Sequence, residues 1–152
     1  MKLNQLFALL PIVLLLMRLT SGTSFAQSLP PLTATEKADL QHHQTYAFLA
    51  KEDRHIKGAW ETYQQLKNSG IQVQHFEVIA IGNAVKSITA EQELGKFIQE
   101  KSDGTFSVTA CQIALDRHKI DKKTLPKAAA VISNGYIRLY QLQAKRHLVI
   151  QP

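Results

Sequence analysis

The chain has 152 residues, of which 45% are hydrophobic and 20% charged, and its 18 basic and 12 acidic residues give a formal charge of +6. This composition is typical of one globular domain with a substantial core and excludes a disordered chain. The basic residues are scattered and not interleaved with aromatics, which favours a solvated surface over a nucleic-acid interface. A single cysteine excludes an internal disulfide, a CxxC redox pair and a cysteine-rich zinc site.

The N-terminal segment has the features of a secretory signal. Lys2 precedes a strongly apolar run over residues 6–17, and Ser24 and Ala26 place small side chains on either side of Phe25, ahead of a cut after Ala26. The apolar run is short for a membrane span. We therefore expect a signal peptide over 1–26, a periplasmic or secreted protein, and no stable membrane anchor after cleavage. The alternative is an uncleaved anchor.

Strand and helix patterns alternate along the rest of the chain. Residues 27–44 are a polar lead-in that begins extended, with either a short helix or an arm from Glu36. The expected strands are Thr45–Ala50, Val73–Ile81, Thr105–Ala110, Ala128–Ile132 and His147–Ile150. The expected helices are Asp53–Asn68, one introduced by Thr89 and Gln92 at capping-box spacing, Gln112–His118 and Tyr136–Lys145. This order predicts one α/β domain over 45–152, with a mainly parallel sheet covered by helices on both faces.

Cys111 lies where the third expected strand meets a helix. Phe106, Val108 and Ala110 alternate with polar residues as in a strand, and the pattern becomes helical from Gln112. The N–H groups at a helix start carry partial positive charge, which favours the thiolate that attacks and carries sulfur. The alternative is a small apolar side chain packed in the core, and position alone does not decide between the two.

The carboxyl ends of parallel strands share one edge of a sheet, and ligands of such folds bind beyond that edge. The ligand-binding candidates that we expect there beside Cys111 are Asn83, Ser133, Asn134 and Gly135. Their amide, hydroxyl and backbone groups can donate hydrogen bonds to a persulfide or an oxyanion. Taken singly, each is equally an ordinary turn or cap residue.

We expect neither a metal nor a cofactor. Adjacent side chains on regular structure point apart and the His42-His43 pair has no evident third ligand, so solvated histidines are favoured over a metal site. The sequence has no glycine-rich dinucleotide loop, no P-loop and no G-x-S-x-G motif.

Three stretches carry a family resemblance: VQHFEVIAIGNAV, FSVTACQIALDRHKI and KAAAVISNGYIRLYQLQAKRHLVIQP. Over Thr45 to Pro152 the chain resembles the DsrE/DsrF-like family of sulfur-relay proteins. The resemblance implies a three-layer α/β/α fold with five parallel strands, homo-oligomers, and a persulfide-carrying cysteine that aligns with Cys111. The implied partners are a sulfane-sulfur donor and an acceptor thiol or protein. The best-understood members are cytoplasmic, so the signal peptide sets this chain apart from them.

Two functions follow from these observations. The first is a sulfur carrier or sulfurtransferase that uses Cys111 as its persulfide-forming thiolate. The alternative is a non-catalytic module on the same fold, which binds a small ligand or assembles into oligomers and keeps Cys111 in its core.

Overall fold

A five-stranded parallel sheet forms the centre of the protein, in the order β4-β3-β2-β1-β5. The computed structural model describes residues 29–152, so the expected signal peptide and the cut after Ala26 lie outside the described residues. The strands are β1 (Thr45–Ala50), β2 (His75–Ala80), β3 (Phe106–Cys111), β4 (Ala129–Ile132) and β5 (Leu148–Ile150). Each observed strand lies within the segment that its sequence pattern predicts, except that β3 extends one residue further, to Cys111.

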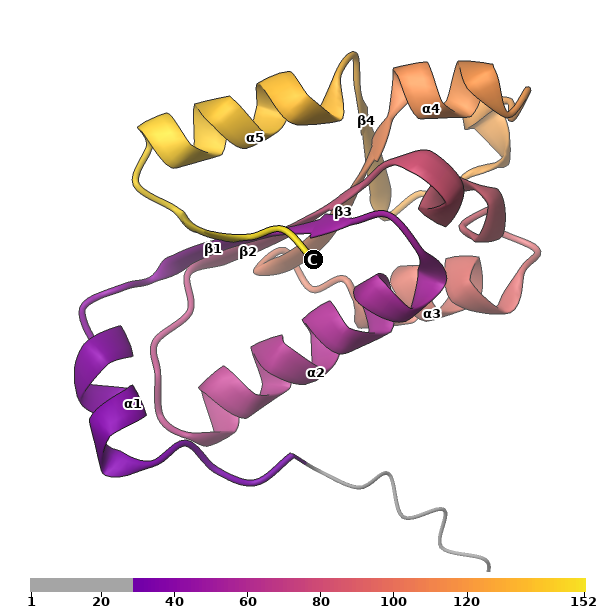
Figure 1. Cartoon of the computed structure of the whole chain (residues 1–152). Coiled ribbons are helices and arrows are strands. Elements are labelled where there is room, and N and C mark those ends of the chain that lie inside the picture. The colour runs from indigo at the N-terminus through magenta and orange to yellow at the C-terminus, as the bar shows by residue number, and fades with distance from the viewer. Residues whose placement is uncertain (1–28) are drawn as a thin grey trace, which may run out of the picture.

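Helices cover both faces of the sheet, so the predicted three-layer α/β/α fold is confirmed (Figure 1). The α-helices are α1 (Ala34–Leu40), α2 (Asp53–Asn68), α3 (Glu93–Lys101), α4 (Gln112–Arg117) and α5 (Gly135–Ala144), and the 3₁₀ helices are η1 (Gly82–Ser87) and η2 (Lys122–Thr124). The first four strands follow one another in a single direction, and the chain then returns to place β5 beside β1. Because crossovers between parallel strands are right-handed, the returning α5 covers the face opposite to α2.

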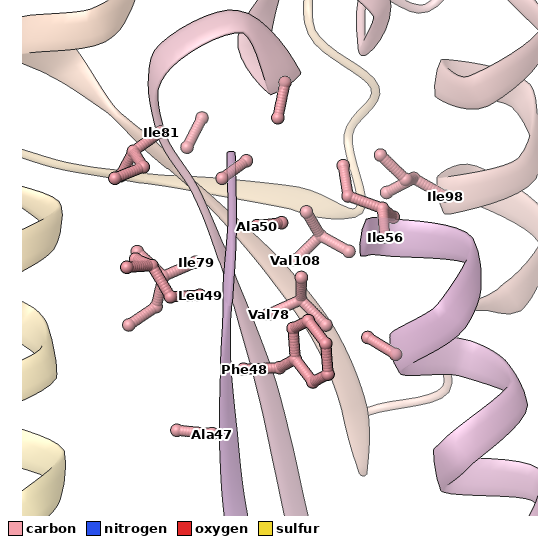
Figure 2. Packing of buried hydrophobic residues seen from close by; sticks show 14 of the residues in the cluster. Ala47, Phe48, Leu49, Ala50, Ile56, Val78, Ile79, Ile81, Ile98 and Val108 are labelled. Carbon is pink, nitrogen blue, oxygen red and sulfur yellow. The ribbon is translucent and has the colours of Figure 1, made fainter. Parts of the chain in front are cut away.

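The core is divided by the sheet into two apolar layers. Successive side chains of a strand point to opposite faces, and Figure 2 shows this division around β1 and β2. The side chains on the α2 face include Phe48, Val78, Val108, Ile56 and Ile98, and those on the α5 face include Ala47, Leu49, Ile79 and Ile81. Odd-numbered residues of β2 and β3 therefore face α5.

Of the two alternatives for the lead-in, the structure has a short helix that packs on the domain. Thr33 and Glu36 form a capping box at the start of α1, with the Glu36 carboxylate accepting from the Thr33 N–H at 2.7 Å. The Leu32 N–H donates to the Ser69 hydroxyl oxygen at 2.9 Å, and Leu32 and Leu40 pack against the core. Among residues 29–152, no helix is long and apolar enough to cross a membrane.

The capping box predicted from Thr89 and Gln92, ahead of α3, is wrong. α3 begins at Glu93 with Gln92 as its N-cap, and no side chain caps it. The Gln92 N–H, which a Thr89 cap would bind, donates to the Thr89 carbonyl oxygen at 3.0 Å. A backbone turn therefore stands where the spacing predicts a side-chain cap. The Ala90 N–H donates to the Thr124 carbonyl oxygen at 2.7 Å, which joins this turn to the connection that contains η2.

Candidate functional site

A hollow of about 360 Å³ lies at the carboxyl ends of β1, β2 and β3, beside the starts of α4 and α5. Its wall is formed by Lys51, Glu52, Ile81, Gly82, Asn83, Cys111, Ile113, Ala114, Arg117, Asn134 and Tyr136. Three of the five expected site residues, Cys111, Asn83 and Asn134, are part of this wall. This position, beyond the strand ends, is where parallel α/β folds bind ligands.

Cys111 is the last residue of β3 and the N-cap of α4. The residue is 5% exposed and contributes to the wall of the hollow. Its Sγ accepts no hydrogen bond from the first N–H groups of α4, the donors that the sequence suggests. The donor is instead the Gly135 N–H at the start of α5, 3.3 Å from Sγ. The thiol is therefore oriented by a helix 24 residues further along the chain.

Gly135 allows α5 to approach the strand ends closely. A Cβ on this residue would lie 2.6 Å from Ile81 Cγ2, 3.1 Å from Ile79 Cγ2 and 3.4 Å from Cys111 Cβ. The first of these distances is shorter than any stable contact between carbon atoms. The absence of a side chain therefore brings the Gly135 N–H within reach of Sγ.

The remaining expected site residues have different roles. Asn134 is the N-cap of α5, and its side-chain oxygen accepts from the Tyr136 N–H at 3.0 Å. It is thus both a cap residue and part of the wall. Asn83 is exposed on η1 at the rim, whereas Ser133 is exposed and lies outside the wall. A ligand-binding role for Ser133 therefore stays a prediction.

Two basic side chains at the hollow were not among the expected residues. Lys51 follows β1, and Arg117 shares one face of α4 with Ile113 and Ala114 because these residues are three and four positions apart. The single acid of the wall, Glu52, is paired with Arg54 at 3.0 Å. The hollow is therefore net positive and suits a small anion. The sequence contained a signal for Arg117, because it lies four and three residues after Ile113 and Ala114 and a helix places all three on one face.

Apart from the hollow, a cluster of polar side chains lies on the α5 face of the sheet. Glu77 on β2 is 2% exposed, and its carboxylate accepts from Arg138 Nε, Arg138 Nη2 and the Thr109 hydroxyl. Burial opposes ionisation, but the hydrogen bonds from Arg138 and Thr109 outweigh it and hold the pKa of Glu77 below its ordinary value of 4.5. The partnership with Glu77 in turn raises the pKa of Arg138.

Two histidines, His75 and His147, lie beside this cluster at the amino ends of the strands. His147 Nε2 lies 3.3 Å from His75 Nδ1, and His75 Nε2 lies 4.0 Å from a Glu77 oxygen. Burial, followed by the proximity of His75, lowers the pKa of His147 from its ordinary 6.5. Within the described residues, no three His, Cys, Asp or Glu side chains gather closely enough to hold a metal ion.

The histidine pair predicts a pH dependence of stability. With a folded pKa below the unfolded value of 6.5, neutral His147 contributes stability that is lost as the pH falls below 6.5. We expect the urea unfolding midpoint to fall between pH 7.5 and pH 5, and His147→Gln to make this decline shallower. His42→Gln, which alters an exposed histidine beyond α1, should leave the slope unchanged. Equal slopes for wild type and His147→Gln would contradict the prediction.

The comparisons with known proteins support the fold and give no information about the function. No family model and no curated protein matches the chain. A solved structure described as a protein of unknown function, MTH1491 from Methanobacterium thermoautotrophicum, superposes with a TM-score of 0.61 at 18% identity. The match covers 70% of this chain and 96% of that one. At this identity the likeness shows a shared fold, and the DsrE/DsrF-like resemblance stays a prediction.

Proposed function

We propose that the protein is a periplasmic or secreted DsrE-like sulfur carrier or sulfurtransferase, in which Cys111 carries the sulfur. One observation supports this most directly: the chain's only thiol borders a hollow at the carboxyl edge of the sheet and receives a backbone hydrogen bond there. The Gly135 N–H directs its positive end at the sulfur, and the thiolate is the nucleophilic form of cysteine.

The proposed transfer needs no external oxidant. The Cys111 thiolate attacks the outer sulfur of a persulfide or polysulfide donor, R–S–S–H. A new sulfur–sulfur bond forms at Cys111, the donor's own sulfur–sulfur bond breaks, and R–S⁻ leaves with the electron pair. An acceptor thiolate then attacks the outer sulfur on Cys111, which regenerates the thiolate. The transferred atom keeps its oxidation level in both steps.

The wall of the hollow suits such a donor. The R–S⁻ that leaves the donor is anionic, and Lys51 and Arg117 supply positive charge at the rim. The apolar side chains of Ile81 and Ile113 limit the approach of water to the sulfur. The Asn83 and Asn134 amides are the polar groups of the wall available to a bound sulfur anion.

The alternative function also has a specific observation behind it. Cys111 is almost fully buried, as in a module whose cysteine is a core residue. Ile113 and Tyr136 in the wall of the hollow are exposed, and so are Ile137 and Tyr140 further along α5. Such a surface is suited to the assembly of copies into a homo-oligomer. In this alternative the hollow binds a small ligand without chemistry at Cys111.

Sulfur loading separates the two functions. We expect purified protein, incubated with a polysulfide and read by intact mass, to gain one sulfur atom at Cys111, and Cys111→Ser to gain none. The matched control is Cys111→Ser combined with Thr35→Cys, which places one thiol on the exposed face of α1. The native thiol should load faster than this surface thiol. A Cys111 that is never loaded, and is alkylated only after denaturation, would favour the binding module.

A further inference from the structure

The buried Glu77 calls for an explanation beyond stability. It lies on β2, between β1 and β3, in a strand whose neighbouring residues are apolar. Replacing a buried ion pair by apolar residues of similar volume is often neutral or stabilising, so such a pair is weak evidence for a stabilising role. A fixed geometry between two elements is the better-supported use of buried polar groups.

The hydrogen bonds of Glu77 link the two elements that meet at Cys111. Arg138 Nε lies 3.0 Å and 3.2 Å from the two carboxylate oxygens, and Nη2 lies 2.7 Å from Oε2. The Thr109 hydroxyl donates to Oε1 at 2.9 Å. Arg138 lies one helical turn after Gly135, and Thr109 lies two residues before Cys111 on the same face of β3. Glu77 therefore joins α5 to β3 directly below the contact between Gly135 and Cys111.

A forked pair constrains the helix in a way that apolar contacts do not. α5 buries Leu139 and Leu142 against the sheet, and such burial is non-directional. The planar guanidinium matches a carboxylate in one orientation. Movement of α5 along or about its axis would break these hydrogen bonds and leave Glu77 buried without its cation. The ion pair thus sets the position of the first residues of α5.

We propose that Glu77, Arg138 and Thr109 are positioning residues that hold α5 so that the Gly135 N–H stays directed at Cys111 Sγ. This inference rests on the proposed function, because a fixed donor at the sulfur matters only to a thiol that reacts. Its test needs no sulfur donor. A failure of sulfur loading and a failure of the positioning role therefore give different results.

The test removes the pair while keeping the packing. In Glu77→Leu combined with Arg138→Met, the unfolding midpoint should stay at or above that of the wild type. The alkylation of folded protein should nevertheless slow by about three- to tenfold at neutral pH, the factor that corresponds to one hydrogen bond. The pH profile of alkylation should move upward, and the Gly135 amide resonance should no longer respond to alkylation of Cys111. Lys145→Met, an exposed change at the C-cap of α5, should alter none of these.

A second variant keeps the inference testable if the double variant does not fold. Arg138→Lys retains a cation for Glu77 but loses the fork. It should weaken the response of the Gly135 resonance to alkylation of Cys111 and move the pH profile upward, both by less than in the double variant. A Gly135 resonance that responds to alkylation as in the wild type, together with an unchanged pH profile, in whichever of these variants folds, would overturn the positioning role. The Glu77–Arg138 pair would then be an ordinary buried ion pair.

Discussion

Gly135→Ala is expected to destabilise the protein by about 1–3 kcal/mol, the usual effect of adding a methyl group to a closely packed site. The new Cβ would lie 2.6 Å from Ile81 Cγ2, so either the Ile81 side chain or α5 must move. Movement of α5 away from the sheet lengthens the contact between the residue 135 N–H and Cys111 Sγ. We therefore expect both a lower urea midpoint and a changed rate of Cys111 alkylation in the folded protein.

The matched control for this substitution is Gly58→Ala in α2. A Cβ at Gly58 meets nothing within 4 Å, and alanine is favoured over glycine in a helix interior. This variant should be more stable than the wild type by about 0.5–1 kcal/mol. Opposite signs for the two glycine-to-alanine changes would show that close approach, rather than helix propensity, decides the effect at residue 135. Equal gains at both positions would contradict the close packing of α5.

The elements that could be predicted from the sequence are those that local side-chain patterns determine. The apolar face of Asp53–Asn68 and the alternation around Phe106–Cys111 each reflect burial on one side of one element. The position of Cys111 at a strand end was predicted for the same reason. The cap predicted at Thr89 is absent because the Gln92 N–H donates to the Thr89 carbonyl oxygen, and the spacing of the two residues does not distinguish this turn from a side-chain cap.

The partner of Cys111 could not be predicted because it depends on where α5 crosses the sheet. The sequence favoured the N–H groups of α4, which are adjacent in the chain, whereas the structure places Gly135 beside Sγ. A signal was nevertheless present in VQHFEVIAI, where Glu77 is the single acid in a strand expected to be buried on both faces. A buried acid requires a cationic partner, and Arg138 is the basic residue in the interior of the helix that covers it.

Arg138→Met gives the largest expected loss of stability, about 3 kcal/mol at neutral pH, because it leaves the Glu77 carboxylate buried without its cation. In the wild type the pKa of Glu77 lies below 4.5, so the pair contributes stability above that pH and loses it as the pH falls through the folded pKa. In the variant, burial becomes the dominant influence and raises the pKa of Glu77, so the carboxyl group takes up a proton as the pH falls and the penalty disappears.

The difference in unfolding free energy between wild type and Arg138→Met should therefore shrink between neutral pH and pH 4.5, measured by urea unfolding at a series of pH values. Lys145→Met removes an exposed cation from the same helix and should show a small effect at every pH. Adding Glu77→Leu to Arg138→Met should bring the stability at neutral pH back to at least that of the wild type, because it removes the unpaired charge itself. A deficit that is equal at all pH values would instead assign the loss to the packing of the arginine stem against the sheet, since methylene contacts do not depend on the protonation of Glu77.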